Sequence, residues 1–220
     1  MISVKDLKKE YRNGEIVTKV LRGIDLEVNN GEFLAIMGKS GAGKSTLLYQ
    51  IGLLDMPTSG KIIVDGVDIQ SLSENEKTNF RLRKMGYVFQ DYALVPELSA
   101  VENIALPLMM SGTEQSVATG YARELMDRIG MSEKYNNRPN QLSGGEQQRV
   151  SIARSIIQSP QILFADEPTA NLDSTSSRIV IELLSELHRS GQTIVMVTHE
   201  EEYAANCDRI IYIDDGKISN

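Results

Sequence analysis

The stretch Leu34-Ala-Ile-Met-Gly-Lys-Ser-Gly-Ala-Gly-Lys-Ser45 decides the fold. Four apolar residues typical of a buried strand are followed at once by a loop of the pattern G-x-x-x-x-G-K-[ST]. The glycines let successive main-chain N–H groups point inward, and the helix expected after the loop presents its positive N-terminal end to an anion. The stretch therefore predicts a strand, a phosphate-binding loop (P-loop) and a helix, in that order.

The loop also predicts how a nucleotide would be held. Lys44 is expected to reach the β- and γ-phosphates, and Ser45 to bind Mg²⁺. A glycine-rich turn that binds nothing is the alternative, and the complete motif between a strand and a helix argues against it. The residues expected to contact the nucleotide are Gly38, Lys39, Ser40, Gly41, Ala42, Gly43, Lys44, Ser45 and Thr46.

The composition is that of a globular protein. The chain has 220 residues, of which 41% are hydrophobic and 24% charged, so it can form one sizeable core and is unlike disordered or fibrous proteins. Its apolar stretches are short, whereas a bilayer span needs about 20 apolar residues, and its N-terminus lacks the features of a secretion signal. Cys207 is the single cysteine, which excludes an intrachain disulfide and a cysteine-based zinc site. We expect a protein of a reducing compartment that neither is exported nor spans a membrane.

The net charge indicates which class of binding partner to expect. The chain has 23 basic and 30 acidic residues and a formal net charge of −7, which argues against a sequence-independent grip on nucleic acid. The one local basic run, residues 81–84, is interpreted as a solvated face. No nucleic-acid partner is expected.

Apolar runs and helical patterns alternate along the chain. Buried strands are expected at 34–37, 87–89, 162–165 and 193–197, and helical spacings between them predict an α/β fold with a mostly parallel sheet. Asp-Gly pairs between apolar flanks predict hairpins within 62–67 and 210–218. The segment from Glu97 to about Gln158 lacks strand-like runs and is interpreted as a helical insert.

Two further helical features can be tested against a structure. An Asp cap and a terminal glycine frame a helix over 173–191, with Ile179, Leu183 and Leu187 expected to form its core-facing stripe. Residues 111–120 include two glycines and should give an irregular start to a helix, because Gly120 costs about 1 kcal/mol relative to alanine inside one.

An acidic pair, Asp166-Glu167, follows the apolar run 162–165. Alone this pattern is weak, because many strands end in acidic residues. Together with a P-loop it predicts that Asp166 holds Mg²⁺ through water and that Glu167, one residue further on, polarises an attacking water as a general base.

The stretch Leu142-Ser-Gly-Gly-Glu-Gln-Gln-Arg-Val150 narrows the family. Ser-Gly-Gly before a helix is a second anion-binding turn, although by itself it would more often be only a cap. With the P-loop and the acidic pair, it makes the chain resemble the nucleotide-binding subunits of ABC transporters. The residues that match this family's signature motif are Ser143, Gly144, Gly145 and Glu146, the last in place of a more common glutamine.

The remaining positions of that family follow in order along nearly the whole chain. Tyr11 resembles the aromatic residue that stacks on adenine, the alternative being a surface tyrosine. Gln90 resembles the glutamine that contacts Mg²⁺ and the attacking water, the alternative being a strand-end side chain in solvent. Asp173 resembles the residue that links two active sites across a dimer, and can also cap a helix. His199 resembles the histidine that contacts the γ-phosphate, whereas His188 is assigned no role.

The resemblance implies a fold and its division. The fold is α/β, a P-loop NTPase core with a mostly parallel sheet, an antiparallel β subdomain and an inserted α-helical subdomain. The core with its β subdomain is expected over 1–96 and 159–220 and the insert over 97–158, within a single domain of 1–220.

The resemblance also implies a mechanism and partners. ATP and Mg²⁺ are the implied cofactors, with Ser45, Gln90 and Asp166 at the metal. ATP would close a head-to-tail homodimer in which Ser143 and Gly145 of one copy meet the γ-phosphate held by the other, and hydrolysis would reopen it.

The sequences of residues 71–90 and of the signature motif resemble those of the lipoprotein-release and macrolide-export branch of the family. A separate transmembrane permease subunit is then implied, docking near Gln90–Leu98 and the helical insert, with this chain on the cytoplasmic face of the membrane. Apolar side chains of this loop, Leu94 and Leu98 among them, could instead form a satellite cluster. Two alternative functions stay open. One is an ABC-type ATPase that acts on nucleic acid or ribosomes. The other is a P-loop kinase, in whose mechanism Ser143 and His199 would have no role.

Overall fold

The computed structural model describes residues 1–219. Contacts within the chain group these residues into two compact units, one formed by residues 1–81 with 191–219 and the other by residues 82–190. The first unit contains the P-loop and both predicted hairpins, and the second contains the acidic pair and the signature motif. No helix in the part of the chain that the structure describes is both long and apolar enough to cross a bilayer.

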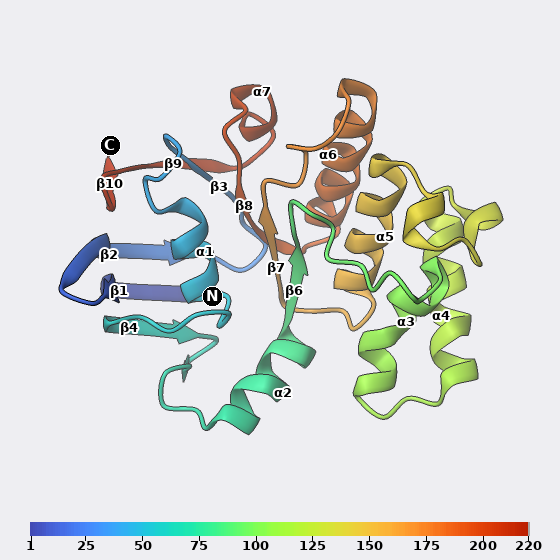
Figure 1. Cartoon of the computed structure of the whole chain (residues 1–220), viewed down its shortest axis with the longest axis horizontal. Helices are drawn as coiled ribbons and strands as arrows, with labels where there is room; N and C mark the ends of the chain where they lie inside the picture. The colour runs from blue at the N-terminus through green and yellow to red at the C-terminus, as the bar shows by residue number, and fades with distance from the viewer. Residues whose placement is uncertain (220) are drawn as a thin grey trace. The chain divides into compact units, whose positions relative to one another are not determined.

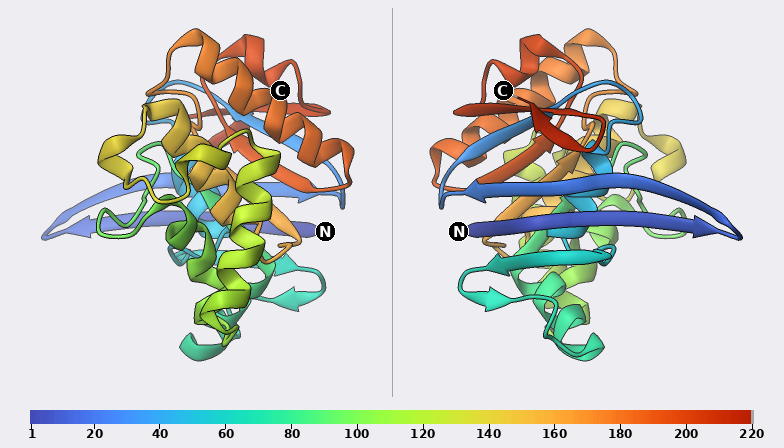
Figure 2. Two further views of the ribbon diagram at one scale, coloured as in Figure 1. Left: turned by 90° about the vertical axis from the view of Figure 1, so that its right-hand side faces the viewer. Right: turned by 90° about the vertical axis from the view of Figure 1, so that its left-hand side faces the viewer.

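An antiparallel sheet in the first unit begins at the N-terminus, with its strands in the order β2-β1-β4-β5 (Figure 1). β1 and β2 form a long two-stranded ribbon (Figure 2). Asp65 and Gly66 join β4 to β5 with positive φ angles of 48° and 79°, as a tight hairpin turn requires, so the first predicted hairpin is confirmed. The strands are β1 (Ile2–Asn13), β2 (Ile16–Val28), β4 (Ser59–Val64) and β5 (Val67–Asp68).

A second sheet of the first unit is built on β3, in the order β10-β9-β3-β8. β8 and β9 pair with β3 in parallel, and β9 and β10 form the second predicted hairpin. Every residue of β3 and β8 is buried, which explains why these strands are continuous apolar runs in the sequence. The elements are β3 (Phe33–Met37), α1 (Lys44–Ile51), β8 (Thr193–Val197), α7 (Glu201–Ala204), β9 (Arg209–Asp214) and β10 (Lys217–Ser219).

The second unit combines two parallel strands with helices. β6 (Met85–Val88) and β7 (Ile162–Asp166) pair so that Val88 lies opposite Ala165. Between these strands the chain forms only helices and turns, as predicted for 97–158, although the boundaries of the insert stay a prediction. The helices are α3 (Ala100–Met110), α4 (Gln115–Arg128), η1 (Ser132–Lys134), η2 (Pro139–Gln141), α5 (Gly144–Ile156) and α6 (Ser174–Arg189), and α2 (Glu74–Lys84) precedes β6.

Three of these helices share an apolar core. α3, α4 and α5 lie side by side in Figure 1 and contribute buried side chains to one cluster. Leu94 packs against this cluster, so for that residue the satellite-cluster interpretation describes the contact. The buried members are Ala100, Val101, Ile104, Ala105, Ala118, Ala122, Met126, Met131, Leu142, Val150 and Ala153.

The stripe predicted for α6 is wrong. Ile179 has 40% of its surface exposed, and the buried face consists of Ser177, Val180, Ile181 and Leu184. Both sets have helical spacing, and at about 100° per residue the mean directions of the two stripes differ by roughly a third of a turn. Spacing alone therefore gave an amphipathic helix without fixing which edge of its apolar face points inward.

The irregular start predicted for α4 holds only in part. Residues 111–114 form a turn, but the helix is regular from Gln115 onward and includes Gly120. The Glu114 side chain accepts hydrogen bonds from the main-chain N–H groups of Ser116 and Val117. Such a cap stabilises the helix and offsets part of the free energy that Gly120 costs it.

Candidate functional site

The P-loop connects β3 to α1 in the first unit. Its main chain has positive φ angles at Gly38 (146°), Gly41 (78°) and Gly43 (106°), which residues with a side chain rarely adopt. A Cβ atom on Gly38 would also lie 2.2 Å from the main-chain oxygen of Ile213. The closed form of this loop therefore depends on its glycines, as the sequence pattern predicts.

The loop leads into a helix whose N-terminus is not closed by a side chain. Gly43 is the N-cap residue of α1, with no side-chain hydrogen bond to the helix start, so the dipole and the first N–H groups face the loop. Lys44 is only 7% exposed, and its amine donates a hydrogen bond to the main-chain oxygen of Lys39 at 3.1 Å. Ser45 and Thr46 follow in the first turn and are half-buried. This arrangement of N–H groups, an amine and hydroxyls suits a phosphate chain.

Tyr11 lies beside the same helix. Its hydroxyl donates to Asp55 Oδ2 at 2.8 Å, and the Lys9 amine is 4.8 Å from the centre of its ring. Partial burial and the hydrogen bond to the Asp55 carboxylate raise the pKa of Tyr11, and the side chain of Thr46 also hydrogen-bonds to it. Because 46% of Tyr11 is exposed, part of its surface remains accessible next to the helix that follows the P-loop.

The parallel pairing of β3 and β8 places His199 at the edge of the sheet where the P-loop begins. β3 and β8 are parallel, with Ile36 opposite Val197, so Gly38 and His199 each come two residues after a paired position. The carboxyl ends of parallel strands lie at one edge of a sheet, where α/β proteins bind ligands. His199 is exposed at this edge.

The same relationship holds for β6 and β7 in the second unit. Val88 lies opposite Ala165, so Gln90 and Glu167 again come two residues after a paired position. Asp166, the last residue of β7, is 6% exposed. Glu167 has a φ angle of 45°, a left-handed conformation that is strained for a residue with a side chain.

The signature turn caps α5. The Ser143 hydroxyl accepts a hydrogen bond from the Glu146 N–H at 3.3 Å, and the Glu146 carboxylate accepts one from the Ser143 N–H at 2.8 Å, which is a capping box. This main-chain hydrogen bond, aided by Lys134 at 3.4 Å, lowers the pKa of Glu146. A Cβ atom on Gly145 would lie 2.5 Å from the Ser176 hydroxyl oxygen, so glycine lets α5 approach the first turn of α6.

Asp173 caps α6, as its alternative interpretation predicts. Its carboxylate accepts hydrogen bonds from the Thr175 and Ser176 N–H groups and from the Ser176 hydroxyl, and the first-turn N–H of Ser176 is the largest cause of its lowered pKa. Nearby, the Asn171 side chain donates to the main-chain oxygen of Gln90 at 3.0 Å. The second unit thus brings together the segments that contain Gln90, Asp173 and the signature turn.

Two residues that hold this region were missed from the sequence. The Arg154 guanidinium donates to the main-chain oxygens of Tyr92 at 3.0 Å and Ala93 at 2.6 Å, and these two residues have positive φ angles of 63° and 48°. Gln148 is fully buried and donates to the main-chain oxygen of Pro168 at 2.6 Å. The signal available for Gln148 was a polar residue four positions before Ile152, on the apolar face of α5.

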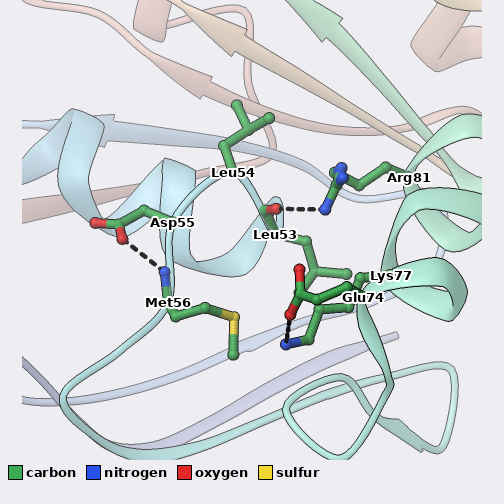
Figure 3. Close-up of a pocket in the computed structure, with 7 residues that line it drawn as sticks. All are labelled: Leu53, Leu54, Asp55, Met56, Glu74, Lys77 and Arg81. Carbon is green, nitrogen blue, oxygen red and sulfur yellow. Dashed lines mark hydrogen bonds and ion pairs between the residues drawn. The ribbon is translucent and has the colours of Figure 1, made fainter.

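A pocket of about 340 Å³ lies in the first unit, apart from the P-loop (Figure 3). Lys77 in this pocket donates to Glu74 at 2.8 Å, and Arg81 donates to the main-chain oxygen of Leu53 at 3.2 Å. Its cations are therefore engaged within the chain, and the pocket has no arrangement typical of catalysis. The lining residues are Leu53, Leu54, Asp55, Met56, Glu74, Lys77 and Arg81.

Comparison with known proteins decides the family. The family model described as ABC transporter matches residues 21–170, which is more than half of the chain and includes the P-loop, the signature turn and the acidic pair. The chain belongs to the ABC transporter family. It has the sequence motifs of an ATP-binding cassette of that family.

The relatives differ in length. The macrolide export ATP-binding/permease protein MacB of Campylobacter fetus is 44% identical over 218 residues, or 99% of this chain and 34% of that protein. The uncharacterized ABC transporter ATP-binding protein MJ1508 of Methanocaldococcus jannaschii is 45% identical over 218 residues, with 97% of its length covered. The chain thus spans about a third of the length of MacB relatives and nearly all of MJ1508.

Solved cassettes have the same fold. A dimeric post-hydrolysis state of the ATP-binding cassette MJ0796, bound to ADP and phosphate, has a TM-score of 0.93 and 40% identity, covering 100% of this chain and 97% of that one. A dimeric structure of MJ0796, a bacterial ABC transporter cassette, has a TM-score of 0.94 at 40% identity. The predicted α/β P-loop fold of an ABC cassette is confirmed.

Proposed function

We propose that this chain hydrolyses ATP as a homodimer around two nucleotides and so powers a separate membrane subunit. The observation that carries the proposal is the presence of two glycine-containing segments at helix N-termini in one chain, residues 38–43 before α1 and residues 143–145 at the start of α5. A P-loop surrounds the phosphates of one nucleotide, and a second anion-binding turn fits the γ-phosphate of a nucleotide held by another copy.

Residues of the first unit bind the nucleotide in this proposal. The main chain of 38–43 and the Lys44 amine bind the phosphates, and Thr46 adds a first-turn contact. Tyr11 stacks on the adenine with its exposed ring. His199, at the same sheet edge as the P-loop, contacts the γ-phosphate. These groups orient the phosphates and stabilise their charge without covalent chemistry.

Residues of the second unit supply the hydrolytic groups. Glu167 accepts a proton from the attacking water as a general base, and Gln90 orients that water. A strained main chain at Glu167 is consistent with a side chain held in one direction.

The donors proposed for Mg²⁺ suit that ion. Ser45, Gln90 and Asp166 offer a hydroxyl, an amide oxygen and a carboxylate, all hard oxygen ligands. Residues 1–219 contain no cluster of three or more His, Cys, Asp or Glu side chains able to hold a metal. When bound, Mg²⁺ would neutralise charge on the β- and γ-phosphates.

The dimer completes each site. Ser143, Gly144, Gly145 and Glu146 of one copy would contact the γ-phosphate bound by the other, and Asp173 would link the two sites. The dimeric cassettes of MJ0796, one bound to ADP and phosphate, support this arrangement. Loss of phosphate would then allow the dimer to open.

A membrane subunit is the proposed recipient of this motion. MacB is named as an ATP-binding/permease protein, and about two thirds of its length lies outside the match to this chain. We place this chain on the cytoplasmic face of the membrane through such a partner, in the macrolide-export and lipoprotein-release branch. Docking is proposed at Gln90–Leu98 and the helical insert.

The variant Glu167→Gln tests the ATPase mechanism. Because the neutral amide cannot accept the proton, it should bind ATP, slow turnover by about 100-fold or more, and sediment as a dimer with Mg-ATP. Glu182→Gln, an exposed change on α6, is the matched control and should hydrolyse normally. A Glu167→Gln variant that hydrolyses ATP at the original rate would disprove the assignment of the base.

The docking surface needs its own test. Leu98→Asp should reduce co-purification of a detergent-solubilised membrane subunit, identified by mass spectrometry, while ATP binding stays normal. Leu94 is unsuitable as a probe because it packs against the insert core. Unchanged co-purification would remove this surface, and retention on single-stranded DNA or on ribosomes would favour the alternative, an ATPase acting on nucleic acid or ribosomes.

A further inference from the structure

Gln148 joins two segments of the proposed hydrolytic site. It lies in α5 with 0% of its surface exposed. Its Nε2 donates to the main-chain oxygen of Pro168 at 2.6 Å and is 3.4 Å from that of Phe89. Pro168 directly follows Glu167, and Phe89 directly precedes Gln90. One side chain therefore holds the main chain next to the proposed base and next to the proposed water-orienting glutamine.

Only one half of the buried Gln148 amide is bonded. Its Oε1 atom has no hydrogen-bond partner among residues 1–219, whereas its nitrogen donates to the Pro168 oxygen. Gly145 and Ile152 lie on the same face of α5, which packs inside the unit. The contribution of this polar side chain to an otherwise mostly apolar face is therefore the bond that its nitrogen makes beside Glu167.

The bond to Pro168 lies directly after a residue with a strained main chain. Glu167 has its left-handed φ angle of 45°, and such a conformation persists only where surrounding contacts impose it. The Glu167 oxygen accepts the Ala170 N–H at 3.2 Å, and the next main-chain acceptor is the Pro168 oxygen bound by Gln148. Loss of this bond would let the Glu167 side chain shift, and a displacement of about 1 Å can cost about 100-fold in rate.

We propose that Gln148 is a positioning residue for ATP hydrolysis. It fixes Glu167 and Gln90 in the geometry needed to hold and deprotonate water, without touching the nucleotide. The inference rests on the proposed roles of these two residues, and it adds a buried side chain of the signature helix to the groups that set the rate.

The test compares Gln148→Met and Gln148→Asn with Gln158→Met. Methionine removes the donor and keeps the volume, and asparagine keeps an amide but draws its nitrogen back from the two carbonyls. Gln158 is the control because its Nε2 also donates to a main-chain oxygen, that of Pro107 at 2.8 Å, which belongs to α3 and not to a segment of the proposed site. For each full-length variant we would measure kcat, KM for ATP and Tm.

We expect Gln148→Met to lower kcat by about 10- to 100-fold with KM within about threefold of the original, and to lower Tm, because the Pro168 oxygen loses its donor. Single-turnover assays should show much less slowing when Gln148→Met is added to Glu167→Gln than when it is made alone, because part of its effect passes through Glu167. Gln158→Met also loses one hydrogen bond to a main-chain oxygen, but should be normal in kcat.

Three outcomes would overturn the inference. The first is an unchanged kcat in both Gln148 variants. The second is a fall in kcat/KM that comes entirely from a higher KM. The third is a single-turnover rate in which the slowing by Gln148→Met adds in full to that of Glu167→Gln. If Gln148→Met does not fold, Gln148→Asn, which keeps a polar amide, decides by the same comparison. Failure of the proposed function gives a different result, since Glu167→Gln itself would then hydrolyse ATP normally.

Discussion

The side-chain amine of Lys44 donates a hydrogen bond to the main-chain oxygen of Lys39, at 3.1 Å. The bond connects the first residue of α1 to the second residue of the P-loop. It holds a nearly buried cation within the loop, where incoming phosphate oxygens would compete with the carbonyl for the amine. The loop itself therefore holds its main cationic group.

Replacing this amine should abolish hydrolysis and leave the fold intact. Lys44→Met keeps the length of the side chain and removes the charge, so we expect ATP turnover to fall by about 100-fold or more, the usual loss for one preorganised charged contact. Phosphate release and the thermal midpoint would be measured together. Lys39→Met is the control, because Lys39 contributes a main-chain oxygen that the change retains, and equal activity of the two variants would contradict the assignment of Lys44.

The ring of Tyr11, and not its hydroxyl, should support nucleotide binding. Base stacking on an aromatic ring contributes about 1–3 kcal/mol, so Tyr11→Ala should weaken ATP binding by about 5- to 100-fold. Tyr11→Phe loses the hydrogen bond to Asp55 and keeps the ring, and should bind within about threefold of the original protein. Calorimetric titration with ATP would measure both. A Tyr11→Ala variant of normal affinity would make Tyr11 a surface tyrosine.

Gly120 should be replaceable with a gain in stability. A Cβ atom there meets nothing within 4 Å, and glycine inside a helix costs about 0.5–1 kcal/mol relative to alanine. Gly120→Ala should therefore raise the thermal midpoint by about 1–4 °C, with unchanged ATPase activity. Gly145→Ala is the opposite case, because its Cβ would lie 2.5 Å from Ser176, and a lower midpoint is expected. A midpoint lowered by Gly120→Ala would show that the helix is irregular there.

Cys207 should be unreactive in the native protein. Burial, aided by the charge of Asp208, raises the pKa of the Cys207 thiol to about 12, and the side chain packs against Ala35, Met37 and Ala204. The thiolate, which is the nucleophile, is therefore scarce until the pH approaches that value. Ellman's reagent at pH 8 should react slowly with the folded chain and rapidly in guanidinium chloride. Rapid reaction without denaturant would show that the segment opens.

The local motifs of this protein could be predicted from the sequence because they depend on neighbouring residues. The glycines of 38–43 determine a loop that only they can form, and the Asp-Gly pairs determine two hairpins. Ser143 with Glu146 and Asp173 with the next turn are caps whose bonds span three residues or fewer. The order of these motifs along the chain was then enough to indicate the family.

Contacts between distant residues were decided only by the tertiary structure. Helical spacing placed Ile179 on an apolar face, but packing of α6 buried Ser177 and Val180. The hydrogen bonds of Gln148 to Pro168 and of Asn171 to Gln90 join residues 20 and 81 positions apart, and no spacing rule relates them. A sequence specifies which groups can donate and accept locally, whereas the buried partner of a side chain depends on which elements fold against each other.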